Sequence, residues 1–218
     1  HAAELLSREE TNTLVEQLKE KSPKLVEEVV GEQVKSAELQ KVLQSLLRER
    51  VPIRDMETIL ETLSEWAPRT KDLDVLTEYV RNALRRTICG QYVEADPQSG
   101  ASRLYCVTLD PSLEDMINGY IERGQAGTSM SMPPSVANRI TTAILQEMQK
   151  LIAAGHHPVV LASPQVRAQV RQILEPHLSN AAVLGYNEVS DGVEVESMGL
   201  VQLESPSPSR RELEGAAQ

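Results

Sequence analysis

Apolar residues recur at helical spacing through the first ninety residues of the chain. Ser7 and Glu10 match a capping box, in which the serine accepts from a first-turn amide while the glutamate reaches back. The Pro after Ser22 predicts a second helix start, and Ser36 predicts the N-cap of a third. Because short amphipathic helices are unstable alone, these segments must share a core.

Two more helices follow a break at Pro52, since a proline disfavours the α conformation in the residue before it. The fourth helix ends near Trp66, and its apolar positions share one face: Met56, Ile59, Leu60 and Leu63. The fifth begins at Thr70 or Asp72 and keeps its period to Ile88. Residues 1–91 are therefore predicted to form an all-helical subdomain.

The pattern changes after residue 92, where short apolar runs alternate with helical segments. Strands are predicted at 104–109, 158–162, 181–184 and 193–201. Helices are predicted at 113–123, from Pro133 to Gly155, and after Ser163, with a loop of small residues at 124–131. We expect residues 92–202 to form an α/β subdomain with a mixed sheet of about four strands, and 203–218 to form a mobile tail. The predicted fold class is α+β.

Composition narrows the possible functions. The 218 residues are 40% hydrophobic and 25% charged, as in ordinary globular proteins. A net charge of −10 argues against nucleic acid or an anionic membrane surface as the main partner. No apolar run approaches the roughly 20 residues of a spanning helix, and no signal-peptide pattern opens the chain, so we expect a soluble piece. Cys89 and Cys106 match no metal spacing and suit a reducing compartment.

Catalytic and cofactor motifs are absent from the sequence. The stretch 124–129 is rich in glycine but lacks the lysine of a phosphate loop, and neither GxSxG nor HExxH occurs. His156 and His157 are adjacent, which allows a metal site, a pH-sensitive loop, or the favoured interpretation, a helix end with dipole contacts. His177 is interpreted as structural. We therefore expect no enzyme activity, no cofactor and no metal.

Two lines of charge lack full partners on their own helices. The fourth predicted helix carries an acidic line at intervals of four residues: Glu57, Glu61 and Glu65. The fifth carries a basic line, Arg81 and Arg85. The simpler hypothesis is that neighbouring helices of one chain pair these charges. The sharper hypothesis is that some of them pair across a subunit boundary, where they would set register and specificity.

Four blocks of the chain closely resemble the export-gate family shared by flagella and type III injectisomes. They are VPIRDMETILETLSEWAPRTKDLDVLTEYVRNALRRTIC (51–89), LYCVTLDPSLEDMI (104–117), GHHPVVLASPQVRAQVRQILE (155–175) and VLGYNEVSDGVEVESMGLV (183–201). This chain resembles the last two subdomains of the family's cytoplasmic half, a helical one followed by an α/β one. The second and fourth blocks resemble the flagellar branch more than the injectisome branch.

The resemblance implies a protein with a membrane-embedded N-terminal half that this chain lacks. It further implies a cytoplasmic ring, typically of nine subunits, at the inner membrane, which receives export chaperones and flagellar substrates and works beside components of the export ATPase complex. Energy would come from that ATPase and the proton gradient. Arg54, Asp55, Arg81 and Arg85 fall in the matching helical block, so with Glu57 and Glu61 they are candidate subunit-interface residues.

Two rival hypotheses of other classes stay open. One is an enzyme with its site at the strand ends near Ser163 or near Asn187 and Glu188, where such sheets bind ligands. The other is a helical adaptor that forms no ring. A hinge between the subdomains at 90–100 is neither predicted nor excluded.

Overall fold

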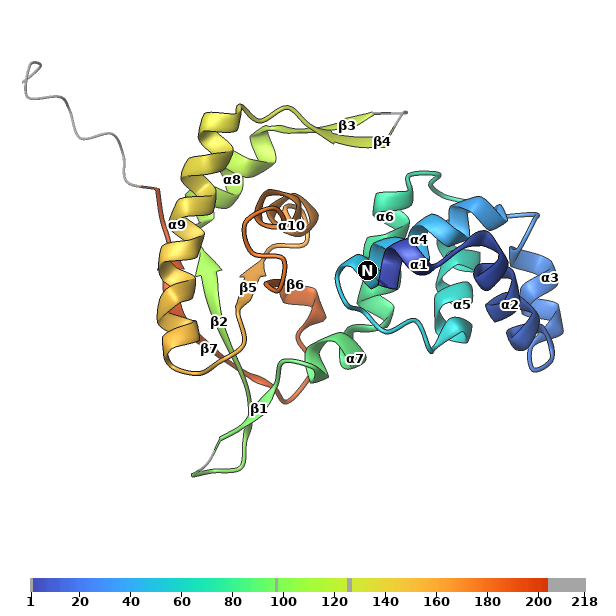
Figure 1. Ribbon diagram of the computed structural model, residues 1–218, viewed down its shortest axis with the longest axis horizontal. Helices are drawn as coiled ribbons and strands as arrows, with labels where there is room; N and C mark the ends of the chain where they lie inside the picture. Colours follow the sequence, from blue (N-terminus) through green and yellow to red (C-terminus); the bar gives the residue numbers. More distant parts are fainter. Residues whose placement is uncertain (1, 97, 125–126, 204–218) are drawn as a thin grey trace, which may run out of the picture.

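The computed structural model describes residues 2–96, 98–124 and 127–203. Seven helices come first, and Figure 1 shows most of them gathered into one half of the molecule. They are α1 (Ala2–Leu5), α2 (Arg8–Lys19), α3 (Pro23–Val29), α4 (Ser36–Arg48), α5 (Met56–Trp66), α6 (Leu73–Ala83) and α7 (Arg85–Gly90). The capping box is confirmed, because Ser7 and Glu10 exchange both hydrogen bonds at the start of α2.

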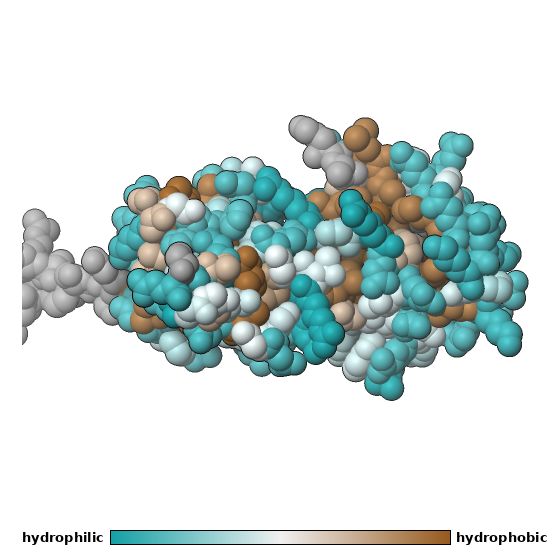
Figure 2. Space-filling view, turned by 90° about the horizontal axis from the view of Figure 1, so that it is seen from below, coloured by the Kyte–Doolittle hydropathy of each residue, from teal (hydrophilic) through white to brown (hydrophobic). Residues whose placement is uncertain are grey.

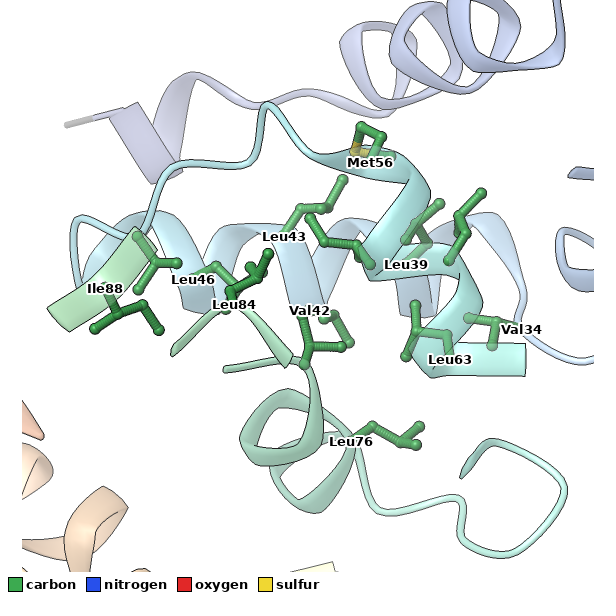
Figure 3. Close-up of a cluster of buried hydrophobic side chains, with 14 of the residues drawn as sticks. Val34, Leu39, Val42, Leu43, Leu46, Met56, Leu63, Leu76, Leu84 and Ile88 are labelled. Carbon is green, nitrogen blue, oxygen red and sulfur yellow. The ribbon is translucent and has the colours of Figure 1, made fainter. Parts of the chain in front are cut away.

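Helix α4 lies at the centre of this half. Its residues Leu39, Val42, Leu43 and Leu46 are fully buried, and Figure 3 shows them beside side chains of α5. The labelled residues of this core come from six segments of the chain: Val34, Leu39, Val42, Leu43, Leu46, Met56, Leu63, Leu76, Leu84 and Ile88. No helix of the described residues is long and apolar enough to cross a membrane.

Two predictions for the helical half need correction, and one helix was missed. Helix α1 was not predicted. Ser36 is the first residue of α4 rather than its cap, since Lys35 is the N-cap and the Ser36 hydroxyl donates to Asn12 instead. The fifth predicted helix is broken at Leu84 into α6 and α7, because Leu84 leaves the helical conformation at φ −86° and ψ 9°.

The second half is built on a five-stranded mixed sheet. Strands β2 (Ser102–Leu109), β5 (Val159–Ala162) and β6 (Ala182–Gly185) run parallel in that order, and β7 (Glu194–Val201) pairs with β2 in parallel. Short β1 (Glu94–Ala95) pairs antiparallel with the start of β2. The α+β class and the mixed sheet are confirmed. A register shift opposite Cys106 and Val107 leaves Met198 as the extra residue of β7.

Helices α8 (Pro111–Gly119), α9 (Pro134–Ala153) and α10 (Arg167–Leu174) complete this half, with a 3-10 turn, η1, at Tyr186–Glu188. The predicted helix at 113–123 ends early. After Gly119 the chain forms β3 (Ile121–Gly124) and β4 (Gly127–Met130), an antiparallel pair where a loop was predicted. The helical spacing of Ile144, Met148 and Ile152 predicts that Ile152 lies on the buried face of α9, but Ile152 is 46% exposed and Leu151 is buried instead. The predicted mobile tail lies outside the described residues from 204 onward.

The two halves share a core. One face of the sheet, with Leu104, Val159 and Leu184, joins the buried cluster of the helical half. The opposite face, with Val107 and Val160, packs under α8, α9 and α10. The division into two subdomains at residue 91 stays a prediction, but the cores on the two sides of that boundary are continuous.

The first testable prediction concerns the centre of this core. Leu43 on α4 is fully buried, so Leu43→Ala removes apolar contacts and leaves a cavity. We expect the free energy of unfolding in urea to fall by about 2–5 kcal/mol. Leu47→Ala on the same helix is the control, because Leu47 is only half-buried. Equal losses for the two variants would contradict the described core.

Candidate functional site

The outer edge of β6 is sealed by arginine side chains. The Val183 carbonyl accepts from Arg167 Nη1 at 3.1 Å and from Arg81 Nη2 at 3.4 Å. The Ala181 carbonyl accepts from Arg171 Nη1 at 3.2 Å. An edge strand buried without partners would leave these carbonyls unsatisfied, at a cost of about 1–3 kcal/mol each. The guanidinium groups thus take the place of a neighbouring strand.

Glutamates from both halves neutralise these arginines. Arg81 binds Glu188 with two nitrogens, at 2.7 and 3.1 Å, and contacts Glu49 at 3.2 Å. Arg167 binds both oxygens of Glu49, at 2.7 and 3.0 Å, and both oxygens of Glu78. We call these five residues the Arg–Glu cluster. Planar guanidinium groups suit such bidentate pairing, which adds geometric specificity to the charge attraction.

The cluster joins the halves because its members come from both. In the helical half, Glu49 directly follows α4, and Glu78 and Arg81 lie on α6. In the other half, Arg167 lies on α10 and Glu188 lies in η1. The two arginines and Glu188 are each about 2% exposed. Burial is the largest effect on the pKa of Glu49 and would raise it, but the charges of Arg167 and Arg81 outweigh burial, so this pKa lies below its ordinary value.

The cluster corrects one sequence-based hypothesis. Arg81 was a candidate for pairing across a subunit boundary. The structure buries it inside the chain, where Glu188 and Glu49 already occupy its guanidinium nitrogens. Arg81 is therefore a structural link between the halves of one chain. Arg85, one turn later, is half-buried and has no ion-pair partner among the described residues.

The other four candidates lie together at the surface around the start of α5. Arg54, Asp55, Glu57 and Glu61 are all exposed. The Asp55 carboxylate is the N-cap of α5 and accepts from the Thr58 amide at 3.1 Å. The Glu57 carboxylate accepts from the hydroxyl of Ser22 at 2.7 Å, which fixes α3 against α5. The side chains of Arg54 and Glu61 form no hydrogen bond or ion pair within the described residues, so their charges are available to a partner.

A shallow groove of about 400 Å³ runs beside these charges, between α2 and the segment 53–57. Its floor is apolar, with Leu18 and Met56 largely buried and Leu14 and Ile53 partly buried. Its rim carries charge and amide groups: Gln17, Lys21, Arg54, Asp55 and Glu57. An apolar floor with a charged rim is the arrangement found in protein interfaces. We call this groove, together with the exposed charges of Arg54, Asp55, Glu57 and Glu61 beside it, the α2–α5 face. The surface seen in Figure 2 is mostly hydrophilic, with hydrophobic residues in smaller patches.

The residues of the enzyme hypothesis do not converge on a catalytic arrangement. Glu188 is held by Arg81 and by the Gly185 amide at 2.7 Å. The Asn187 amide bonds Asn82, and the backbone amide of Ser163 bonds Glu114. A polar cleft of about 500 Å³ does separate α6 and α10, but its carboxylates Glu49 and Glu78 are the ones that Arg167 binds.

The two histidines anchor the start of the sheet. His156 follows α9, lies 2.9 Å from a carboxylate oxygen of Glu94, and stacks on Tyr105 with 3.8 Å between ring centres. His157 meets Tyr92 edge to face. Within the described residues no three His, Cys, Asp or Glu side chains gather as a metal site would require. Both cysteines are buried and free, and burial raises the pKa of Cys106 to about 12.

The FHIPEP family model matches residues 1–194. The chain belongs to the FHIPEP family. Among its relatives, the flagellar biosynthesis protein FlhA of Bacillus subtilis (strain 168) is 37% identical over 203 residues, which are 93% of this chain. The protein hrpC2 of Xanthomonas euvesicatoria is 33% identical over 88% of the chain.

Solved structures of FHIPEP relatives share the fold. The CdsV protein of Chlamydia pneumoniae superposes with a TM-score of 0.80 at 32% identity, over 92% of this chain and 56% of its own. The nonameric SctV-C of EPEC gives 0.77 at 29% identity, over 92% of this chain and 58% of its own. The chain spans 29% of the length of each of the two relatives named above. By its family and its relatives, the chain is a segment of the cytoplasmic domain of an export-gate protein, in the family of flagellar and type III secretion proteins.

The Arg–Glu cluster gives a prediction about stability. Arg167→Met keeps the apolar stem but leaves Glu78 without its ion-pair partner, Glu49 with Arg81 alone, and the Val183 carbonyl less satisfied. Removing one partner of a buried ion pair costs about 3–5 kcal/mol, and we expect a loss of that size in chemical denaturation. Arg85→Met, at an arginine without an ion-pair partner in the described chain, is expected to change stability by less than about 0.5 kcal/mol. Similar values for both would refute the structural role of the cluster.

The lowered pKa of Glu49 gives a pH dependence. A depressed folded-state pKa stabilises the fold above the unfolded value, about 4.3, and this contribution is lost as the pH falls through the folded value. The free energy of unfolding should therefore fall on acidification below about pH 4.3. In Glu49→Gln that fall should be smaller, and Asp115→Asn on the exposed face of α8 serves as the control. An acid limb unchanged in Glu49→Gln would contradict the assignment.

Proposed function

We propose that the chain is a non-catalytic assembly module, the part of an export-gate cytoplasmic domain that joins neighbouring subunits into a ring and offers that ring's surface to other proteins. The observation that carries the proposal is the match, over about nine-tenths of the chain, to two relatives whose structures are nonameric. One is SctV-C of EPEC, and the other is the EscV cytosolic domain of a type III secretion system, with a TM-score of 0.74.

The α2–α5 face is the proposed ring contact within this segment. Its charges are exposed and of both signs, so a neighbouring subunit can meet Arg54 with a carboxylate and Glu61 with a cation. Complementary charges of this kind set register and suppress wrong partners more than they add affinity. The apolar floor of the groove supplies surface that a neighbour would remove from water.

The non-catalytic part of the proposal is supported by the state of the buried polar groups. Glu188 pairs with Arg81, Arg167 pairs with Glu49 and Glu78, and both arginines also donate to a backbone carbonyl, which suits a structural link. An enzyme site would instead present convergent polar groups with perturbed titration in a well-formed pocket. The α2–α5 face, with its apolar floor and charged rim, is suited to binding other proteins.

The flagellar branch is the one we favour. The flagellar relatives of Bacillus subtilis and Caulobacter vibrioides are 37% and 34% identical. The protein hrpC2 of Xanthomonas euvesicatoria is 33% identical, the invasion protein InvA of Salmonella typhimurium 31%, and the low calcium response locus protein D of Yersinia pestis 28%. We further propose that the whole protein sits in the inner membrane with this segment on the cytoplasmic side, where export chaperones, flagellar substrates and ATPase-complex components meet it. A CdsV structure in complex with the CdsO protein supports binding of a second protein to this domain type.

Ring formation is testable in the complete cytoplasmic half, because this chain spans only 58% of the nonameric SctV-C structure. Reversing two charges of the α2–α5 face, by Arg54→Glu with Glu61→Arg, should lower the ring population in mass photometry by about tenfold or more at fixed concentration. Like charges across an interface cost up to several kcal/mol, which is ample for that shift.

The matched control reverses an exposed charge on the other half, by Asp115→Arg on α8. It should leave the ring population as in the unaltered protein. Rings unaffected by the double reversal would remove the α2–α5 face from the account. A cytoplasmic half that never forms rings, even when tethered to vesicles, would favour the helical adaptor over the proposed function.

A further inference from the structure

The two edges of the main sheet are finished differently. The β6 edge is buried and its carbonyls accept from arginines, as described above. The β7 edge is open: residues 194–197 and 200 are exposed, and no strand pairs with the outer side of β7 in the described residues. Further contacts lie at the end of the strand: the Gly199 carbonyl accepts from the hydroxyls of Thr108 and Ser197, the Val201 carbonyl accepts from the Asp110 amide, and the Glu147 side chain of α9 lies against Gly199. A row of unpaired backbone groups this long is a template for another strand.

One face of β7 is apolar and uncovered. Val195 pairs with Leu104 and Leu200 with Thr108, so these side chains point to the sheet face that the helical half partly covers. They lie beyond that cover, since Val195 is 43% and Leu200 47% exposed. β7 has no Pro or Lys, and its bulge at Met198 and its two glutamates are the features that limit pairing with an unselected strand.

The other face of β7 is acidic. Glu194 and Glu196 alternate with Val195, and both are exposed. Glu194 pairs with Arg103 at 3.1 Å, while Glu196 has no ion-pair partner in the described chain. Charges of opposite sign that face each other across neighbouring strands stabilise a sheet, and like charges destabilise it. The edge therefore favours a basic neighbour.

We propose that the β7 edge binds an extended segment of a partner polypeptide as an added strand, in which apolar residues alternate with lysine or arginine. Backbone hydrogen bonds to β7 supply affinity, and the alternation supplies specificity: apolar residues cover Val195 and Leu200, and cations face Glu196. A second copy of β7 fits less well, because it brings its own Glu194 and Glu196 to the same ladder. The inference concerns the chain by itself and holds whether or not the chain forms a ring.

The test uses the 218-residue chain and a fluorescent nine-residue peptide in which Lys alternates with Val. Anisotropy should show saturable binding, and hydrogen exchange should slow at the amides of β7. Three comparison peptides should bind at least about tenfold more weakly: one with Glu for Lys, one of scrambled order, and one N-methylated at alternate residues so that it cannot form the ladder.

Variants of the chain locate the site. Glu196→Lys and Leu200→Lys should each weaken binding by about three- to tenfold. Glu27→Lys and Leu5→Lys are matched controls, because both residues are exposed and lie in the helical half. Equal binding by the N-methylated peptide, unchanged exchange in β7, absence of binding, or equal losses in the controls would each overturn the proposal. So would slow β7 exchange caused by dimerisation of the chain without peptide, which would make a second copy the occupant.

Discussion

The structure depends on arginine side chains that complete the hydrogen bonding of a buried strand edge. Arg81 and Arg167 reach the Val183 carbonyl, and their charges are neutralised by Glu49, Glu78 and Glu188. Without the arginines, β6 would bury unsatisfied carbonyls, and without the glutamates, the arginines would be unpaired charges away from water. Since the arginines and glutamates come from both halves, neither half has a satisfied interior when separated from the other.

This link has a consequence for function. The continuous core beneath the cluster and the ion pairs above it fix the sheet against α4 and α6, so the outer surfaces keep a constant relative geometry. A ring built through the α2–α5 face would then hold each sheet, and its open β7 edge, at a defined place around the ring. The polar groups of the interior are used to hold the chain together, and the groups available to partners lie outside.

Much of the fold was predictable because local signals agreed with the tertiary structure. The capping box at Ser7, the break at Pro52 and the buried strand at 159–162 follow from short stretches of sequence. The β3–β4 hairpin was missed because neither of its four-residue strands alternates apolar with polar residues. The function of Arg81 was missed because Glu188 lies 107 positions away. One signal was available: Arg81 falls within the apolar stripe of its helix, between Thr77 and Leu84, and a charge in such a stripe indicates a buried pair.

The claim that the halves form one cooperative unit can be measured directly. Trp66 is the single tryptophan and reports on the helical half, while amide exchange in β5 reports on the sheet. Unfolding in urea should give coincident transitions by Trp66 fluorescence and by β5 exchange, as expected for one two-state unit. Separate midpoints, with the helical half unfolding while β5 stays protected, would contradict the account.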